Sequence, residues 1–398
     1  MKKSLLLFVL ATFILSVGCK GKGTNSTATA EPGVIITGAE QLDEYLPLLE
    51  GKKVGMMGNQ TSIIGDKHLV DVLLEKGVDL KFGFAPEHGF RGDIERGEKV
   101  SNDVDKQTGL PLFSLYGKND KADSIVASVD VMIFDIQDVG ARFYTYITSL
   151  HHVMQLCANN GKKLIVLDRP NPNGDQVDGP VRKDDEYKSG VSYHKIAMIH
   201  GLTIGELAKM INGEGWLDNG AQCDLTVVPV KGYTHKMQYE IPVVPSPSLP
   251  NQLSVRLYMS LCLFEGTDIS IGRGTDFPFQ VIGYPDPSFG DFTFTPEARP
   301  GMSAHVEQKG NLCYGVDLRG LKPESATFTL KYVLDFYKKM PDTFFSDPKF
   351  FNKLAGNADL QEQIKAGWTE EQIRDSWKDE LAAYKAMRKK YLLYEDFE

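Results

Sequence analysis

The sequence has no excess of positive charge, few cysteines and no paired metal-ligand spacing, and each absence removes a class of function. Its 44 Lys and Arg residues stand against 53 Asp and Glu residues, giving a net charge of −9. Nucleic acid is therefore not expected as the main partner. The five cysteines among 398 residues form no CxxC pair, and HExxH does not occur. We therefore expect no metal site.

Signatures of nucleotide binding and of serine hydrolases are also missing. The glycines at 55 and 58 flank two methionines instead of forming GxGxxG, and neither a Walker A loop nor a GxSxG turn occurs. Phosphate binding and the serine nucleophile elbow depend on such loops, so we expect no cofactor. Cys157 and Cys262 lie in apolar sequence and are interpreted as small buried side chains.

The N-terminal segment has the composition of an export signal followed by a tether. Two lysines precede an apolar run at 5–17, which is shorter than the roughly 20 residues of a membrane-spanning helix. The small residue and Cys19 that follow resemble a bacterial lipoprotein box, in which the cysteine is acylated. We expect a lipoprotein signal peptide at 1–19, a flexible tether at 20–33, and an exported lipoprotein anchored to the membrane and facing the periplasm. Cleavage without lipidation and a retained anchor helix are the alternatives.

Short apolar runs alternate with amphipathic segments through the first two thirds of the chain. The apolar runs predict strands at 53–58, 80–85, 131–135, 164–167 and 225–230. The segments with helical spacing predict helices at 68–76, 148–160 and 203–212. This alternation indicates an α/β fold with a mostly parallel sheet flanked by helices. Ligands of such sheets bind beyond the carboxyl ends of the strands.

The composition changes after residue 283, where Pro and Phe become frequent and the expected strands shorter. At roughly 150 residues per domain, this change predicts a large catalytic domain at 34–283 and a smaller α+β C-terminal domain at 284–398. Near the C-terminus, the charge pattern predicts one long helix at 369–390, with Thr369 as its N-cap.

Polar residues that follow the strands form the candidate site. After the strand at 80–85, two glycines hold Glu87, His88 and Arg91 close together. A carboxyl, an imidazole and a guanidinium in one loop suit general acid–base catalysis, and an ordinary polar turn is the alternative. Asn59, directly after the first strand, is a weaker candidate for binding substrate.

A second motif leaves the strand that ends near residue 135. Asp135 and Asp138 come first, and Arg142, Tyr144 and Tyr146 follow. Aromatic faces and forked donors together suit a sugar ring. The alternative is that Asp135 or Asp138 caps the following helix.

Two further motifs add candidates for binding substrate. Asp168, Arg169 and Asn171 follow another strand in a loop that two prolines stiffen, and a structural ion pair is the alternative. Glu265 and Arg273 belong to a glycine-rich segment that can bring a guanidinium to an anion, and a surface turn is the alternative.

Five long motifs occur in one order: PEHGFRG, DIQDVGARFYTY, LDRPNP, HGLTIGELA and FEGTDISIGRGT. Together they resemble the exo-β-N-acetylmuramidase family of the NamZ type, formerly DUF1343, from about residue 34 to residue 394. The resemblance implies a Rossmann-like domain, a smaller C-terminal domain and an active cleft between them. It implies a glycoside hydrolase that releases terminal N-acetylmuramic acid from the non-reducing end of peptidoglycan fragments, such as MurNAc-GlcNAc saccharides.

The resemblance also implies that Glu87 is the catalytic residue, and it assigns no second group. Our hypothesis is that Glu87 protonates the glycosidic oxygen while His88 and Arg91 orient it. Glycoside cleavage needs a second carboxylate or a substitute for it. Asp135 or Asp138 would serve as that carboxylate or would orient the substrate's acetamido group for internal attack.

The lactyl carboxylate of N-acetylmuramic acid calls for a guanidinium partner. Arg91, Arg142 and Arg273 are the candidates, and the sequence does not rank them. Tyr144 and Tyr146 are expected to line the sugar. Two rival functions are a non-catalytic peptidoglycan-binding lipoprotein that uses the same cleft, and an esterase or amidase acting on the same polymer.

Overall fold

The structure is a computed structural model that describes residues 34–87, 89–91, 103–115, 119–298 and 306–398. The signal peptide, Cys19, the tether and His88 lie outside the described residues, and the expectations for them stay predictions. In the part of the chain that is described, no helix combines the length and the apolar character that crossing a membrane requires.

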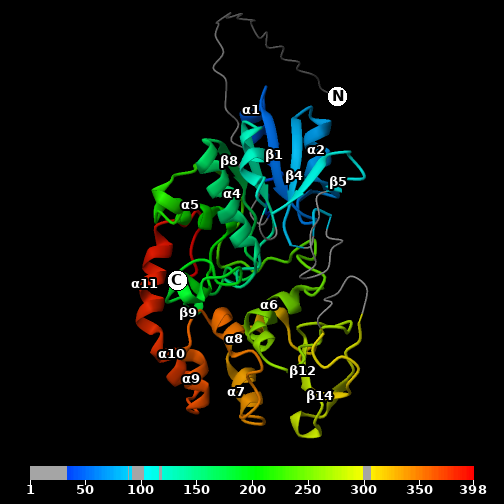
Figure 1. Cartoon of the computed structure of the whole chain (residues 1–398), viewed down its shortest axis with the longest axis vertical. Helices are drawn as coiled ribbons and strands as arrows, with labels where there is room; N and C mark the ends of the chain where they lie inside the picture. The colour runs from blue at the N-terminus through cyan, green and yellow to red at the C-terminus, as the bar shows by residue number, and fades with distance from the viewer. Residues whose placement is uncertain (1–33, 88, 92–102, 116–118, 299–305) are drawn as a thin grey trace, which may run out of the picture.

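A seven-stranded sheet dominates the N-terminal part of the molecule (Figure 1). Its strand order is β11-β8-β7-β1-β4-β6-β5, and every neighbouring pair is parallel except β5 with β6. In chain order the strands are β1 (Lys53–Gly58), β4 (Asp79–Ala85), β5 (Asp103–Val104), β6 (Pro111–Ser114), β7 (Val131–Asp135), β8 (Lys163–Leu167) and β11 (Asp224–Val228).

The order in which the chain adds strands to the sheet reverses at β1. The chain adds β4 and β6 on one side of β1 and then crosses over to add β7, β8 and β11 on the other side. This is the strand order of the Rossmann fold, in which ligands bind at the carboxyl ends of the strands near the reversal. The parallel sheet, its flanking helices and a small C-terminal antiparallel sheet confirm the predicted fold class.

Alternate residues of the strands enter cores on opposite faces of the sheet. In β7, Met132 and Phe134 belong to the larger core, whereas Val131 and Ile133 belong to the smaller one. Helices cover both faces, so β1, β7 and β8 are buried on both sides along nearly their whole length and are apolar almost throughout. The helices on the larger core are α3 (Ala122–Ala127), α4 (Tyr146–Asn160) and α5 (Ile204–Gly213), and those on the smaller core are α1 (Leu42–Leu49) and α2 (Leu69–Glu75).

Local interactions fix the start of one helix and the end of another close to where the sequence predicts them. Thr203 Oγ1 accepts a hydrogen bond from the Glu206 backbone N at 3.3 Å, and the Glu206 carboxylate accepts one from the Thr203 backbone N at 2.9 Å. This reciprocal capping box starts α5. Helix α4 ends at Gly161, whose φ of 59° is the left-handed conformation that glycine adopts without steric cost.

The C-terminal part packs on the same larger core as the sheet, because that core extends from Met57 to Tyr384. It holds an antiparallel sheet of order β12-β14-β13, and in Figure 1 α11 (Lys378–Lys389) lies below α5 and beside β9 (Asp178–Val181). Its remaining elements are α6 (Gln252–Leu261), β12 (Val281–Tyr284), β13 (Phe292–Phe294), β14 (Cys313–Asp317), α7 (Lys331–Tyr337), α8 (Pro348–Ala355) and α9 (Asp359–Lys365). Two small antiparallel sheets complete the described strands: β2 (Ile63–Ile64) with β3 (Lys67–His68), and β9 (Asp178–Val181) with β10 (Ala197–Ile199).

The prediction of one long helix at 369–390 is wrong. The segment forms α10 (Glu370–Ser376) and α11 (Lys378–Lys389), and Thr369 caps the first of them as expected. Between them, Trp377 has φ −107° and ψ 6° and is 4% exposed. Burial of its ring in the larger core accompanies the break. Neither proline nor glycine marks the position, so the sequence shows only a continuous charge pattern.

Candidate active site

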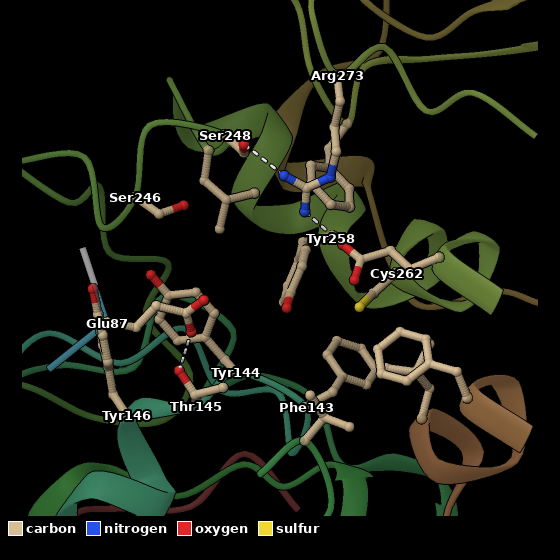
Figure 2. A pocket seen from close by; sticks show the side chains of 16 residues that line it. Glu87, Phe143, Tyr144, Thr145, Tyr146, Ser246, Ser248, Tyr258, Cys262 and Arg273 are labelled. Atoms are coloured by element: carbon tan, nitrogen blue, oxygen red, sulfur yellow. Dashed lines mark hydrogen bonds and ion pairs between the residues drawn. The ribbon is translucent and has the colours of Figure 1, made fainter. Parts of the chain in front are cut away.

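A cavity of about 210 Å³ lies beyond the carboxyl end of β4 and is lined by residues from both parts of the chain. It brings together five of the predicted site residues: Glu87, Tyr144, Tyr146, Glu265 and Arg273. Figure 2 shows the glutamate and the two tyrosines gathered on one side and the arginine across from them. The other candidates within the described residues do not line this cavity.

Glu87 is placed by the turn that ends β4. The Pro86 carbonyl accepts a hydrogen bond from the Gly89 backbone N at 3.1 Å, and Gly89 has a φ of 82° that favours glycine. Glu87 is 9% exposed, and its Oε2 accepts a hydrogen bond from Thr145 Oγ1 at 2.8 Å. The carboxyl group is therefore oriented by the residue that precedes α4 (Figure 2).

Tyr144 and Tyr146 form an aromatic wall beside Glu87. Their ring centroids are 4.8 Å apart at an interplanar angle of 73°. Burial raises the pKa of both phenols, and the nearby Glu87 charge raises the pKa of Tyr146 further. Both hydroxyls therefore stay protonated at neutral pH. Tyr146 donates to the Pro245 carbonyl at 3.1 Å, and the buried Tyr144 hydroxyl lies beside it.

Arg273 faces this wall with its guanidinium held from two directions. It donates to Glu265 Oε1 at 2.5 Å and to Ser248 Oγ at 2.6 Å, and it lies 4.8 Å from the centroid of the Phe279 ring. Its Nε is buried and has no hydrogen-bond partner within the described part of the chain. The flanking Gly274 has a φ of 80°, and a Cβ there would lie 2.4 Å from the Glu297 carbonyl oxygen, so the loop needs glycine at this position.

Asp135 is bound in a buried ion pair outside the cavity. Arg169 Nε and Nη2 donate to its two carboxylate oxygens at 2.5 and 2.8 Å. Burial raises the pKa of Asp135, and the Arg169 charge opposes that shift. The third motif therefore does form a structural ion pair, but the partner of Arg169 is Asp135 on the neighbouring strand and not Asp168.

Asp168 instead anchors the start of α5 and the C-terminus of the chain. It accepts hydrogen bonds from Thr203 Oγ1 at 2.7 Å, from the Gly205 backbone N at 2.8 Å and from Tyr394 Oη at 2.5 Å. Burial raises its pKa to about 6. Asp168 therefore has a structural role, because it ties the N-terminus of α5 to the last residues of the chain.

Asp138 lies next to the aromatic wall. One of its oxygens, Oδ2, accepts a hydrogen bond from the Gly140 backbone N at 2.7 Å, and the other, Oδ1, is buried without a partner among the described residues. Its charge contributes to the raised pKa of Tyr144 and of Tyr146. The alternative that Asp135 or Asp138 caps the following helix is wrong: Thr145 holds the N-cap position of α4 and makes no side-chain cap bond.

Arg142 does not line the cavity, because its guanidinium is bound to backbone carbonyls. The fully buried Arg142 guanidinium donates to the carbonyl oxygens of Pro180, Ile196 and Leu354 at 2.8, 2.8 and 2.9 Å. Burial, with a smaller contribution from another arginine, lowers its pKa to about 9. Arg142 therefore supports the backbone around the cavity wall, since Leu354 lines that cavity.

The remaining candidates shape nearby loops. Arg91 binds Asp105 at 2.8 Å and Asp71 at 3.3 Å. Asn171 Nδ2 donates to the Leu202 carbonyl at 2.9 Å. Asn59 Oδ1 accepts a hydrogen bond from the Thr61 backbone N at 2.9 Å. The Nδ2 of Asn59 is buried and has no partner in the part of the chain that is described.

Several lining residues were not singled out from the sequence, although they stand beside ones that were. Thr145 lies between the two predicted tyrosines, and the serines of the proline-rich segment at 245–251 form a wall opposite them. The lining residues without a prediction are Phe143, Thr145, Val191, Ser246, Ser248, Leu249, Tyr258, Cys262, Phe279, Phe350 and Leu354. Within the described residues, no group of three or more His, Cys, Asp or Glu side chains is arranged to hold a metal ion. Cys157 and Cys262 are buried and unbridged, as interpreted from the sequence.

Comparison with known proteins identifies relatives across nearly the whole chain. The family described as exo-β-N-acetylmuramidase NamZ matches with its N-terminal domain at 54–253 and its C-terminal domain at 256–394. The peptidoglycan β-N-acetylmuramidase NamZ of Bacillus subtilis (strain 168) is 36% identical over 419 aligned positions, covering 99% of this chain and all of that protein.

Two crystal structures of DUF1343 family proteins from Bacteroides fragilis share the fold. One has a TM-score of 0.84 and 43% identity, and the other has a TM-score of 0.79 and 31% identity. Each comparison covers 91% of this chain and 99% of the other protein.

Proposed function

Because this chain belongs to the NamZ family of β-N-acetylmuramidases and is a glycoside hydrolase, we propose that it releases terminal N-acetylmuramic acid from the non-reducing end of peptidoglycan fragments. One observation carries the proposal most strongly: a carboxyl group and a guanidinium, those of Glu87 and Arg273, line a single cavity together with aromatic faces. Glycosidic bond cleavage needs the first, and an acidic sugar needs the second.

Glu87 acts as the general acid. A carboxyl group at the strand end can reach the glycosidic oxygen while Thr145 holds its orientation through the 2.8 Å hydrogen bond. Proton transfer to the leaving oxygen relieves the charge that would otherwise build up on it in the transition state. The sugar released is the one whose ring occupies the cavity.

Arg273 is the partner of the lactyl carboxylate. Of the three arginines considered from the sequence, it is the one that lines the cavity, and Glu265 and Ser248 take only two of its five N–H donors. Tyr144 offers a buried hydroxyl to the sugar, and the ring faces offer apolar contact with its C–H groups.

Asp138 is the better placed of the two aspartates for a second role. Both oxygens of Asp135 are taken by Arg169, whereas Asp138 keeps one buried oxygen without a partner in the described part of the chain. Its charge also favours the protonated form of Tyr144 and Tyr146. Because Asp138 does not line the cavity, we assign it to keeping the hydroxyls of the two tyrosines protonated, so that it acts on the substrate through them.

The test is incubation with MurNAc-GlcNAc, followed by identification of the released sugar by mass and of its anomer by NMR. Glu87→Gln should abolish release without changing the unfolding curve, because the amide keeps the shape of the side chain but donates no acidic proton. Glu240→Gln, at an exposed glutamate that does not line the cavity, is the matched control. Near-normal turnover by Glu87→Gln would reject the assignment.

We also propose that Cys19 carries the lipid anchor on the periplasmic side of the membrane, as the order of charges, apolar run and cysteine in the sequence supports. Growth with an alkyne-tagged fatty acid should label the wild-type protein and not a Cys19→Ala variant. Equal labelling of both proteins would refute acylation at this cysteine.

A further inference from the structure

A second cavity, of about 120 Å³, lies beside α4 and is assigned no function by the family resemblance. Half-buried Tyr193 and Trp216 form its walls, and the exposed amino groups of Lys188 and Lys195 stand at its mouth. Its volume accommodates several water molecules, which is the size of a small polar group and not of a whole saccharide.

The floor of this second cavity consists of buried polar groups. His151 Nδ1 and His194 Nε2 are 3.1 Å apart and share one hydrogen bond. Burial lowers the pKa of His151 to about 3 and holds the pKa of His194 well below its usual value. Both imidazoles are therefore neutral at physiological pH and act as hydrogen-bonding groups, not as charges.

Two floor atoms have no partner of their own. His194 Nδ1 and Arg182 Nε are buried and make no hydrogen bond to any described residue, and their residues are 3% and 4% exposed. Arg182 Nε is always a donor, and His194 Nδ1 is one in the tautomer in which His151 Nδ1 donates to His194 Nε2. Leaving a buried donor unsatisfied is costly, so a ligand group that accepts a hydrogen bond here gains more than it would at the surface.

The electrostatic balance of the cavity favours an anion. Arg182, Lys188 and Lys195 supply three positive charges. The carboxylate of Asp185 accepts from Arg182 Nη1 at 3.0 Å and lies 4.0 Å from Lys195, but its side chain is 78% exposed. Asp218 also acts on this region, since it raises the pKa of Tyr193. Positive charge still exceeds negative charge.

The second cavity adjoins the first along two segments of chain. Helix α4 contributes Tyr146 to the first cavity and His151 to the second, and five residues of helix span roughly 7.5 Å. The loop before β10 contributes Val191 to the first and Tyr193 to the second. A polymer bound in the first cavity therefore passes close to the second.

We propose that the second cavity is a carboxylate-binding subsite, which takes the lactyl group of a muramic acid farther along the same glycan chain. The inference rests on the proposed function, since it takes the substrate to be a polymer that repeats this acidic sugar. The aromatic walls contact the methyl group of the lactyl substituent, the lysines attract its carboxylate, and Arg182 Nε and His194 Nδ1 donate to the carboxylate oxygens.

The experiment compares MurNAc-GlcNAc with its tetrasaccharide repeat as substrates. The double variant Lys188→Ala/Lys195→Ala removes two exposed charges, so the fold should persist. We expect KM for the tetrasaccharide to rise roughly three- to tenfold, as loss of two exposed ion pairs permits, with KM for the disaccharide and both kcat values unchanged. The difference should shrink in high salt. Lys389→Ala, at an exposed lysine of α11 outside both cavities, should change nothing.

A binding measurement separates this inference from the proposed function. In the Glu87→Gln background, tetrasaccharide binding measured by calorimetry should weaken in the lysine double variant, whether or not the wild type cleaves the disaccharide. D-lactate alone, as a free small carboxylate, should bind far more weakly than the tetrasaccharide. Equal affinity of the variant and its parent for the tetrasaccharide would overturn the subsite. Tight binding of D-lactate would overturn the glycan as its ligand.

Discussion

The ion pair between Asp135 and Arg169 offers a direct test of whether Asp135 is a structural or a chemical residue. Its two hydrogen bonds, at 2.5 and 2.8 Å, join side chains that are 0% and 3% exposed. Replacing Asp135 by Leu leaves the Arg169 guanidinium unpaired in the interior, where Nη2 still donates to the Ile63 carbonyl at 3.1 Å.

The expected cost follows from that isolation. Breaking a buried pair from one side destabilises a protein by about 3–5 kcal/mol. Asp135→Asn, which keeps one acceptor oxygen, should fall at the lower end, and Asp135→Leu at the upper end. In a chain of this size, such a loss should lower Tm by roughly 5–10 °C. The exposed pair Lys67–Glu75, with side chains 59% and 58% exposed, is the control: Glu75→Gln should cost less than about 1 kcal/mol.

Urea unfolding monitored by circular dichroism measures these differences, and a double variant isolates the pair. Asp135→Leu combined with Arg169→Met removes both charges and should regain most of the lost stability, because no unpaired charge is left behind. Below its unfolding transition, Asp135→Asn should cleave MurNAc-GlcNAc within tenfold of wild type. If Asp135→Asn abolishes cleavage and leaves the unfolding free energy unchanged, Asp135 is a chemical residue and the reasoning fails.

Three further predictions concern the cavity and its support. Thr145→Val removes the hydroxyl that donates to Glu87 and should lower kcat roughly tenfold or more, as a charge-assisted hydrogen bond permits. Thr145→Ser keeps a hydroxyl and should restore kcat. An unchanged kcat of the Val variant in steady-state kinetics would contradict the orienting role of Thr145. Arg273→Lys should raise KM for MurNAc-GlcNAc because the forked guanidinium is lost, and an unchanged KM would exclude Arg273 as the lactyl partner. Burial lowers the pKa of His68 to about 4, so folding favours its neutral form. The resulting contribution to the free energy of unfolding is present above pH 6.5 and is lost as pH falls towards 4, by up to about 3 kcal/mol. His68→Asn keeps the N-cap acceptor used by Val70 and should show a flatter fall in urea-unfolding free energy between pH 7 and pH 4.5; an identical fall would rule out His68 as a source of that acid sensitivity.

The sequence by itself predicted the features that depend on neighbouring residues. Apolar runs predicted five of the seven strands in the large sheet, because strands covered on both faces need no polar alternation. The sequence analysis missed β6 and β5, which are short and more exposed. The predicted helix bounds at 203 and 160 hold for equally local reasons, since a capping box starts α5 and a left-handed glycine ends α4. The motif that follows β4 contained Glu87, since parallel strands bring their carboxyl ends to one edge. Arg273 was found instead in a glycine-rich segment between α6 and β12, outside the parallel sheet.

Tertiary structure alone decided which charges face the cavity and which support it. Asp135 and Arg169 lie 34 residues apart, and they meet because β7 and β8 are parallel neighbours. Arg142 stands in the same motif as the cavity tyrosines, yet its guanidinium is used by three backbone carbonyls. A charged side chain that becomes buried must pair with a group that the packing of distant segments places beside it. The identity of that partner produces no local pattern in the sequence.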